Sequence, residues 1–380
     1  MRDSVVYGFL GKALFLAAVV ALSACAGLQS SMPATTGAMP SWQAMHAARP
    51  ACAPARVGEA QCLVLVQSEG AVSPLIVGWE PSNLQTRYKL PSKSKGSGQV
   101  VAVVDAYDNP NVASDLAKYR SAFGLGTAKF RKYNEDGEQG NYPAGSEGWG
   151  VEIDLDAQMV SASCPRCTIY LIEANSDDGS DLSQAEAEAV KLGAHIVSNS
   201  WICYGSTACV NQSDFDHAGI LYLGSSGDEG ENKNGAPSAL DSVAAIGGTV
   251  LSENGSGYKE SVWPDSGGGC ETAIKKPAWQ DDTFCDGRAV ADGSAVAWDV
   301  AEYDSYGYGG WFEVGGTSVA SPLVAGMFAL AGNATKQDGG RTFWETAHHK
   351  DLYDVCGSSC LSKTYSYGGG WGSPDGLGAL

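Results

Sequence analysis

Basic residues, and charged residues in general, are scarce in this chain of 380 residues. It has 24 Lys and Arg against 43 Asp and Glu, for a formal net charge of −19, and charged residues make up 18% of the sequence. Such an acidic surface repels phosphate backbones, so the composition excludes nucleic acid as a partner. The 49 glycines and the 44% share of apolar residues exclude a coiled coil and favour a loop-rich globular protein.

No apolar run near the N-terminus is long enough to span a membrane. Residues 13–21 have the sequence ALFLAAVVA and follow the basic residues Arg2 and Lys12. A short apolar run after a basic start is typical of the core of a signal peptide. We therefore expect an exported protein that loses residues 1–24.

The apolar run ends in Leu22-Ser23-Ala24-Cys25, which resembles the bacterial lipobox. The resemblance implies that Cys25 is acylated and anchors the protein in a membrane through lipid alone. Because Ala26 is not an aspartate, it also implies the outer membrane, with the protein facing the periplasm or the cell surface. The alternative is ordinary signal cleavage after Ala24-Cys25-Ala26, which would give a secreted protein.

The eleven cysteines form an odd set, and removal of Cys25 leaves ten. In an exported chain, cysteines that are close in sequence are expected to pair, so we predict five local disulfides. A redox-active site or half a zinc site is the alternative for the CxxC pair, but no second CxxC accompanies it. The expected pairs are Cys52 with Cys62, Cys164 with Cys167, Cys203 with Cys209, Cys270 with Cys285, and Cys356 with Cys360.

The composition changes along the chain and predicts one domain. Residues 26–50 are rich in Ala, Ser, Thr, Met and Pro without a period, which is typical of a flexible tether. Residues 51–95 hold one short strand-like run, too little for a core of their own, and we interpret them as a short extension or a vestigial pro-segment. We place the domain at residues 96–380.

Strand and helix patterns alternate through this domain. Apolar runs predict buried strands, and amphipathic stretches between them predict helices. The strands are expected at 99–105, 168–173, 195–200 and 220–225, and the helices at 109–123, 150–162, 182–192 and 213–218. This order predicts an α/β fold, a doubly wound sandwich with a central, mostly parallel sheet. In such folds the residues at strand exits form the sites.

The strongest functional signal is the segment 314–330, VGGTSVASPLVAGMFAL. Ser318 stands at the entry of a helix that is apolar almost all round, where the helix dipole favours negative charge. A serine N-cap on a core helix is the alternative. The string G-T-S-x-A-x-P is similar to the nucleophile motif that subtilisins and sedolisins share.

A histidine suited to activate Ser318 is missing. None of the five histidines opens a helix between the first strand and Ser318 in an H-G motif; they are His46, His195, His217, His348 and His349. Glu152 and Asp156 occupy the expected helix instead, four residues apart and on one face, beside an apolar row. A solvated acidic face is the alternative interpretation of this pair.

Two further carboxylates stand at strand exits. Asp228 follows the strand at 220–225 and would donate a hydrogen bond to an oxyanion if it were protonated; the alternative is an ordinary turn residue. Asp105 closes the strand at 99–105 as the aspartate of subtilisins does. Without a partner histidine we expect it to have a structural or supporting role.

Together, Ser318, Glu152, Asp156 and Asp228 resemble the catalytic set of the sedolisins, the serine-carboxyl peptidases, and the resemblance extends over residues 96–380. It implies a subtilisin-like fold and an acid-acting serine-type endopeptidase that hydrolyses peptides or proteins, works as a monomer and needs no cofactor for its chemistry. Ser318 would attack, Glu152 would act as base, Asp156 would orient Glu152 by sharing a proton, and Asp228 would hold the oxyanion. A catalytically silent, lipid-tethered relative that binds peptides or other surface partners is the alternative.

The same resemblance suggests two secondary sites. Residues Ser198, Asn199 and Ser200 resemble the family's substrate-binding edge, with a plain strand end as the alternative. Asp354 resembles one ligand of a structural calcium site. Gly372 stands where the second carboxylate belongs, although Asp375 could compensate, so we expect calcium binding to be weakened or lost.

Overall fold

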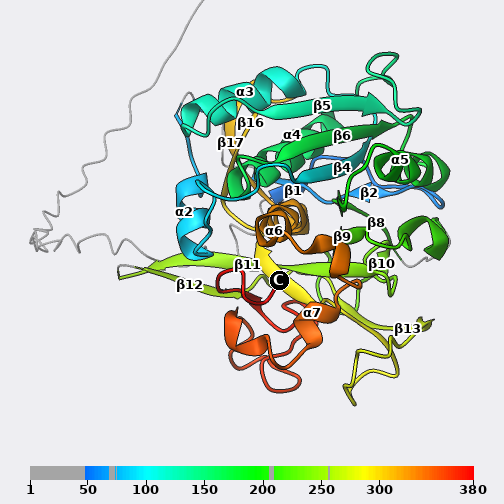
Figure 1. Ribbon diagram of the computed structural model, residues 1–380, viewed down its shortest axis with the longest axis vertical. Helices are drawn as coiled ribbons and strands as arrows, with labels where there is room; N and C mark the ends of the chain where they lie inside the picture. Colours follow the sequence, from blue (N-terminus) through cyan, green and yellow to red (C-terminus); the bar gives the residue numbers. More distant parts are fainter. Residues whose placement is uncertain (1–47, 68–72, 74, 205–208, 256) are drawn as a thin grey trace, which may run out of the picture. The chain divides into compact units, whose positions relative to one another are not determined.

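The computed structural model describes residues 48–380, except 68–72, 74, 205–208 and 256 (Figure 1). The predictions of a signal peptide, of acylation at Cys25 and of a tether therefore fall almost wholly outside the described residues, as does His46. Within the described part of the chain, no helix is both long and apolar enough to cross a membrane.

An eight-stranded sheet forms the centre of the domain, in the order β12-β11-β9-β7-β4-β6-β5, with β15 also paired to β11. The strands from β11 to β5 are parallel, and only β12 joins as an antiparallel hairpin. The mostly parallel sheet is confirmed. Its members are β4 (Val100–Ala106), β5 (Lys129–Asn134), β6 (Thr168–Ala174), β7 (Ile196–Asn199), β9 (Leu221–Ser225), β11 (Val243–Asn254), β12 (Gly257–Val262) and β15 (Gly293–Val296).

Helices cover this sheet, as expected of a doubly wound fold (Figure 1). Helices α4 and α6 pack against each other and against the central strands, α3 packs on α4, and α5 packs on β4 and β6. The long helices are α3 (Val112–Ala122), α4 (Glu147–Ser163), α5 (Gly179–Lys191) and α6 (Thr317–Ala331). Each of these helices was predicted, with boundaries displaced by up to three residues.

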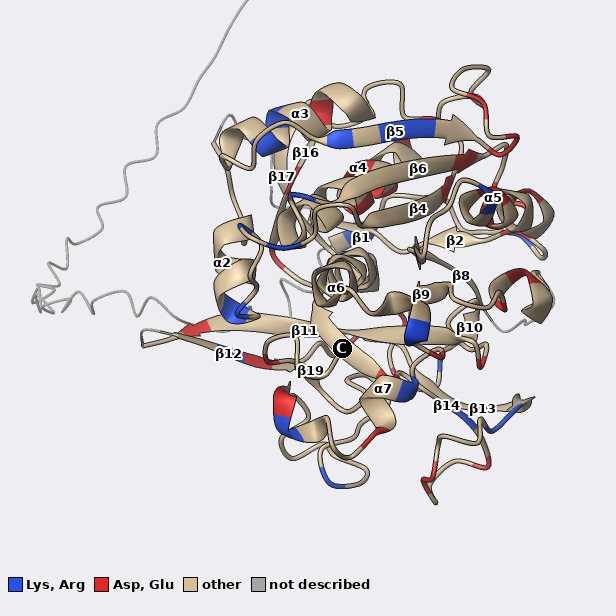
Figure 2. Cartoon of the chain, viewed as in Figure 1, with Lys and Arg blue, Asp and Glu red and all other residues tan. Residues whose placement is uncertain are grey.

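Edge strand β5, which Figure 2 colours partly blue, carries the exposed residues Lys129 and Arg131, whereas Lys132 pairs with Asp108 and Glu173. Charged side chains on an edge strand discourage pairing with another chain. Two of the few basic residues of the protein therefore lie on an edge strand of the central sheet, where they disfavour pairing with another chain.

One predicted helix is wrong. The stretch 213–218 forms only a short 3₁₀ turn at Gln212–Phe215, in which Phe215 alone is buried. A stable surface helix needs several apolar residues on one face, and here only one residue is buried. The segment therefore forms a loop that connects two elements. The strand expected at 195–200 also ends early: β7 stops at Asn199, and Trp201 opens a separate strand.

Residues 51–95 share sheets with the domain that we placed at 96–380. Strand β2 (Gln61–Cys62) pairs with β8 (Trp201–Tyr204), and β3 (Leu65–Gln67) pairs with β17 (Gly310–Gly315). The boundary at residue 96 therefore does not separate two packing units. The two smaller sheets also contain β1 (Ala48–Pro50), β10 (Gly235–Ala236) and β16 (Val300–Asp304), and residues 51–95 also form helix α2 (Pro81–Arg87).

The C-terminal part of the chain consists of short elements, which include two antiparallel strand pairs, β13 with β14 and β18 with β19. They are β13 (Gly269–Lys275), β14 (Gly287–Val290), α7 (Arg341–Trp344), β18 (Leu352–Tyr353) and β19 (Ser373–Pro374).

All five predicted disulfides are present, so the pairing of cysteines that are neighbours along the chain is confirmed. The CxxC pair is a disulfide in this structure and therefore offers no thiolate to a zinc ion. Cys52 is bonded to Cys62, Cys164 to Cys167, Cys203 to Cys209, Cys270 to Cys285, and Cys356 to Cys360.

Candidate active site

Ser318 is the second residue of α6, a helix buried from Thr317 to Leu330. Gly316 precedes the helix with a φ of +116°, where side-chain-bearing residues are strained. A Cβ at Gly316 would lie 2.0 Å from the carbonyl oxygen of Leu63 and 2.7 Å from Asp228 Oδ2. The glycine is therefore required by the close approach of two other segments to the entry of α6.

Glu152 lies directly against Ser318. The Ser318 hydroxyl donates to Glu152 Oε2 at 2.9 Å, and the backbone N–H of Leu63 donates to the same oxygen at 2.8 Å. Both side chains are fully buried. Burial and the nearby Asp105 raise the pKa of Glu152 well above its usual value, while the hydrogen bond from Ser318 opposes this rise.

Asp156 lies one turn further along α4 and is also fully buried. Its Oδ1 accepts a 2.6 Å hydrogen bond from the hydroxyl of Ser200. Among the described residues, neither Asp156 Oδ2 nor Glu152 Oε1 has a hydrogen-bond partner, so the proton-sharing contact expected between the two carboxyls is not formed. Burial, Asp105 and Glu152 raise the pKa of Asp156 well above its usual value.

Asp105, for which the sequence suggests a structural or supporting role, interacts electrostatically with Glu152 and Asp156. It is fully buried at the end of β4, and neither of its oxygens has a hydrogen-bond partner among the described residues. Burial raises its pKa to about 8. Because its charge also raises the pKa of Glu152 and Asp156, the site holds three interacting carboxyls instead of two. The only signal in the sequence was its place at a strand exit.

Asp228 contacts the residue immediately before Ser318. Its Oδ1 accepts from the backbone N–H and from the hydroxyl of Thr317, both at 2.8 Å. Burial raises the pKa of Asp228 to about 7, against the opposing effect of the two Thr317 hydrogen bonds. Its Oδ2 has no partner in the described part of the chain, so in acid this oxygen carries a proton that is free to be donated.

Of the three predicted substrate-binding residues, only Ser200 faces the site. Its carbonyl oxygen accepts from the hydroxyl of Ser318 at 3.3 Å. The side chains of Ser198 and Asn199 are used within the fold, since Ser198 Oγ bonds Ser321 Oγ at 2.9 Å and Asn199 Nδ2 donates to the carbonyl of Leu223 at 3.2 Å. Both side chains are fully buried and hold α6 and β9 against β7. Backbone pairing of a peptide with this edge stays a prediction.

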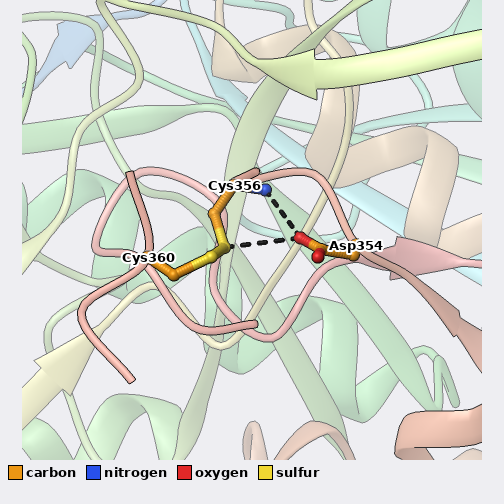
Figure 3. A group of neighbouring side chains, drawn as sticks. All are labelled: Asp354, Cys356 and Cys360. Atoms are coloured by element: carbon orange, nitrogen blue, oxygen red, sulfur yellow. Dashed lines mark hydrogen bonds between the residues drawn. A yellow bond between two sulfur atoms is a disulfide. The ribbon is translucent and has the colours of Figure 1, made fainter. Parts of the chain in front are cut away.

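The carboxylates that the sequence suggests as calcium ligands have other partners within the protein. Asp354 Oδ1 accepts a hydrogen bond from the backbone of Cys356, and Figure 3 shows Asp354 beside the Cys356–Cys360 disulfide, which leaves no thiolate to bind a metal. Asp375 accepts from Lys89 Nζ at 2.7 Å instead. Calcium needs several converging oxygens, so these residues do not fit it.

A second group of acids lies on the far side of α4. One carboxylate oxygen from each of Asp115, Asp154 and Asp304 lies within 4.8 Å of the others, and all three residues are buried. Asp304 accepts from three backbone N–H groups of the turn after β16, and Asp115 accepts from Ser305. Most of these oxygens are therefore used within the fold.

Two bacterial proteins are similar in sequence to this chain over more than half of its length. The chain is 26% identical to sedolisin from Pseudomonas sp. (strain 101), over 80% of this chain and 60% of that protein, and 28% identical to kumamolisin from Bacillus sp. (strain MN-32), over 66% and 51%. It therefore spans little more than half the length of these curated relatives. A structure of Pseudomonas sedolisin complexed with two molecules of pseudo-iodotyrostatin matches with a TM-score of 0.66 and 22% identity, over 79% of this chain and 96% of that one.

The fold is shared more widely. Sphericase matches with a TM-score of 0.54 and 16% identity, over 80% of this chain and 99% of the other. At this identity the match concerns the subtilisin-like fold alone. The model of the subtilase family matches residues 140–354, which hold Glu152, Asp228 and Ser318. More than half of the sequence is covered by that match, and the chain therefore belongs to the subtilase family.

Proposed function

We propose that this protein is a serine-type endopeptidase of the serine-carboxyl kind, which cleaves peptides or proteins through an acyl-enzyme on Ser318. The observation that carries the proposal is the 2.9 Å hydrogen bond from the Ser318 hydroxyl to Glu152 Oε2 in a fully buried site. A nucleophilic serine needs a base within hydrogen-bond distance, and among the described residues Ser318 Oγ bonds no histidine. This contact favours the peptidase over a catalytically silent relative.

The proposed reaction assigns one role to each acid. Ser318 Oγ attacks the substrate carbonyl as Glu152 takes its proton, and Glu152 returns that proton to the departing amine. Asp228, protonated, donates from Oδ2 to the oxyanion, and loss of one such donor typically costs about 10² to 10³ in rate. Asp156 interacts electrostatically with Glu152 from one turn away, and water then releases the acyl group with Glu152 again acting as base. No step requires a cofactor.

The same acids support an acid optimum. As the pH rises through the pKa of Asp228, about 7, the proton needed for the oxyanion is lost. Glu152 has to be ionised to act as base, so its raised pKa sets the lower pH limit of activity, while Asp228 sets the upper one. Activity should therefore fall above neutral pH.

The lipobox-like sequence at Cys25 supports an exported, outer-membrane-anchored form, with ordinary secretion as the alternative. The net charge of −19 supports a protein partner over nucleic acid, and we propose that the peptidase acts as a monomer. Globomycin-sensitive processing together with radiolabelled palmitate incorporation, lost in Cys25→Ala, would test the anchor.

Peptide hydrolysis tests the function itself. Purified residues 26–380 are incubated with a mixed peptide library from pH 3 to 8, and products are identified by mass spectrometry. We expect internal bonds to be cleaved in acid and no cleavage by Ser318→Ala. Equal cleavage by both proteins would overturn the proposal.

A further inference from the structure

The protein's own residues 58–67 lie beside Ser318 and cover it from one side. Residues 58–62 run between two edges of the domain. On one edge, the N–H of Ala60 donates to the carbonyl of Asp177 at 2.7 Å, and the N–H of Gly179 donates to the carbonyl of Gly58 at 3.0 Å. On the other edge, Cys62 pairs antiparallel with Trp201 in β8. The segment is thus the middle strand of three, as a bound extended peptide would be.

The next residue along the chain, Leu63, lies beside Glu152 and Ser318. Its N–H lies 3.2 Å from the carbonyl oxygen of Ser200 and 2.8 Å from Glu152 Oε2. Its carbonyl oxygen and Asp228 Oδ2 approach the same point beside Gly316, where a Cβ would lie 2.0 Å and 2.7 Å from them. The carbonyl of Leu63 and the acid that we assign to the oxyanion therefore both lie beside Gly316, two residues before Ser318.

The chain remains bound after Leu63. Strand β3 lies between β1 and β17, with Val66 paired to Val314, and Leu65 packs on the cluster that contains Trp263 and Trp298. Both sides of the Leu63–Val64 bond are thus held by backbone pairing to different sheets. An external peptide therefore has to compete with this segment for the place beside Ser318.

A covalent clamp connects the two sides. The Cys52–Cys62 disulfide ties the residue before Leu63 to the end of β1, and the N–H of Ala51 donates to the carbonyl of Val64 at 3.0 Å. If the Leu63–Val64 bond were cut, both new ends would still be held beside Ser318. This arrangement differs from a pro-segment that leaves after a single cut.

We propose that residues 58–67 are an intramolecular inhibitor bound in the register of a substrate, with Leu63–Val64 as the bond presented to Ser318 and Cys52–Cys62 as the clamp that retains it. The inference rests on the proposed peptidase function. It also assigns the substrate class: an extended peptide that adds as a strand beside β8, with an apolar residue in the place of Leu63.

The chemistry at the clamped bond is reversible. Attack of Ser318 Oγ on the Leu63 carbonyl breaks the bond to the Val64 nitrogen, which takes the proton held by Glu152. Because β3 and its pairing to β17 keep the new amine beside the acyl group, the reverse attack reforms the peptide bond and returns the proton through Glu152 to Ser318. The segment therefore inhibits without being consumed.

The test compares three forms of residues 26–380. These are the unaltered chain, the double variant of Cys52→Ser with Cys62→Ser, and a control of Cys270→Ser with Cys285→Ser, which opens a disulfide of another hairpin. Initial rates are measured at pH 5 with a fluorogenic peptide that has Leu before the reporting bond. We expect the first double variant to raise kcat/KM at least tenfold and the control to leave it within twofold, with every rate abolished by Ser318→Ala.

A second variant guards against misfolding of the first. Ala60→Pro removes the N–H that donates to Asp177 and should also raise kcat/KM, and circular dichroism checks that each protein is folded. In trans, a disulfide-closed peptide of residues 48–67 should inhibit the opened variants competitively. Equal Ser318-dependent activity in the unaltered and opened chains would overturn the inhibitor but leave the peptidase standing. Folded variants without any Ser318-dependent activity would overturn the peptidase itself.

Mass spectrometry tests the register. Any cut in residues 58–67 of the folded chain should produce a new N-terminus at Val64. A cut at another bond of this segment would contradict the placement of Leu63 at the reacting groups.

Discussion

At the scale of single residues, the main question is how the carboxylate of Glu152 can act as the base in place of an imidazole. Water stabilises an exposed carboxylate and keeps its pKa near 4, too low for a useful base. Here burial removes that stabilisation, and Asp105 adds repulsion, so the pKa of Glu152 rises. The hydrogen bond from Ser318 then favours the ionised form and points the proton to be transferred at the base.

We expect Glu152→Gln to lower kcat by about 10² to 10⁴, the range that a positioned general base supplies. The amide keeps the shape of the side chain but cannot accept the serine proton, so the melting temperature should not fall. Rates are measured with the opened chain that carries Cys52→Ser and Cys62→Ser, where external peptide can enter.

Glu302→Gln is the matched control for this substitution, since Glu302 is another fully buried glutamate with no hydrogen-bond partner among the described residues. It should leave kcat within a few-fold of the unaltered chain. Full activity in Glu152→Gln, or an equal loss in Glu302→Gln, would show that Glu152 does not act as the base.

Asp228 predicts a change in the pH profile. An amide donates a hydrogen bond at every pH, so Asp228→Asn should keep most of the rate in acid and move the loss of activity, expected near pH 7, to higher pH. Asp228→Ala has no donor and should lose about 10² to 10³ in rate at all pH values. Identical pH limits in Asp228→Asn and the unaltered chain would remove Asp228 from the oxyanion role.

At the scale of elements, the contact between α4 and α6 sets the distance between Glu152 and Ser318. The two helices approach closely where α6 has Gly326, since a Cβ there would lie 2.0 Å from the hydroxyl oxygen of Ser163 on α4. Small residues at a helix crossing allow such an approach, and packed helices do not absorb an added methyl without moving.

Gly326→Ala should therefore destabilise the protein by about 1 to 3 kcal/mol and also reduce kcat, because α6 carries Ser318 away from Glu152. The double variant of Gly326→Ala with Ser163→Ala removes the hydroxyl that meets the new methyl and should recover part of both losses. Thermal melts and peptide hydrolysis measure the two effects. A stability loss without any change in kcat would mean that this crossing does not position the nucleophile.

The elements also show what the sequence could predict. Local signals in the sequence were sufficient to predict α4 and α6. Helix α6 is apolar with a serine at its entry, and α4 has two acids four residues apart on one face. The pairing of β2 with β8 and of β3 with β17 was missed, since it joins segments more than a hundred residues apart with no local mark of their partner. For the same reason the sequence could not show which side chain of residues 198–200 turns toward the site, because that depends on where β7 ends.

The disulfides were predictable for the opposite reason. Cys167, Cys209 and Cys285 each bond a cysteine 3, 6 or 15 residues earlier in the chain, so the partner of each lies within its own turn or hairpin. Cysteines this close in sequence can meet independently of how distant strands pair. Proximity along the chain was therefore sufficient to predict these disulfides.

At the scale of the whole molecule, the notable feature is the number of buried acids. Burial is the first cause that raises the pKa of each of them, and it does so to about 7 in Asp228, about 8 in Asp105 and about 9 in Glu173. The pKa is also raised, well above its usual value, in Glu152, Asp154, Asp156, Glu186 and Glu302. An acid whose pKa is raised in the fold holds its proton more tightly there than in the unfolded chain.

This difference predicts that the protein is most stable in acid. Below about pH 4 such groups are protonated in both states, and their stabilising effect is fully present. As the pH rises, the unfolded chain loses these protons first, so stability falls until the folded pKa values of about 7 to 9 are passed. Each proton held only by the folded state changes the free energy of unfolding by about 1.4 kcal/mol per pH unit.

We therefore expect the melting temperature of the Ser318→Ala protein, which cannot digest itself, to fall steadily between pH 4 and 8. Glu302→Gln in the same background should raise the melting temperature at pH 8 and flatten the slope, because an amide loses no proton in the unfolded state. Lys191→Gln alters an exposed side chain and should leave the slope unchanged. A melting temperature that rises toward pH 8, or a slope unaffected by Glu302→Gln, would mean that these acids are ionised in the fold, and the neutral Asp228 on which the proposed chemistry depends would lose its support.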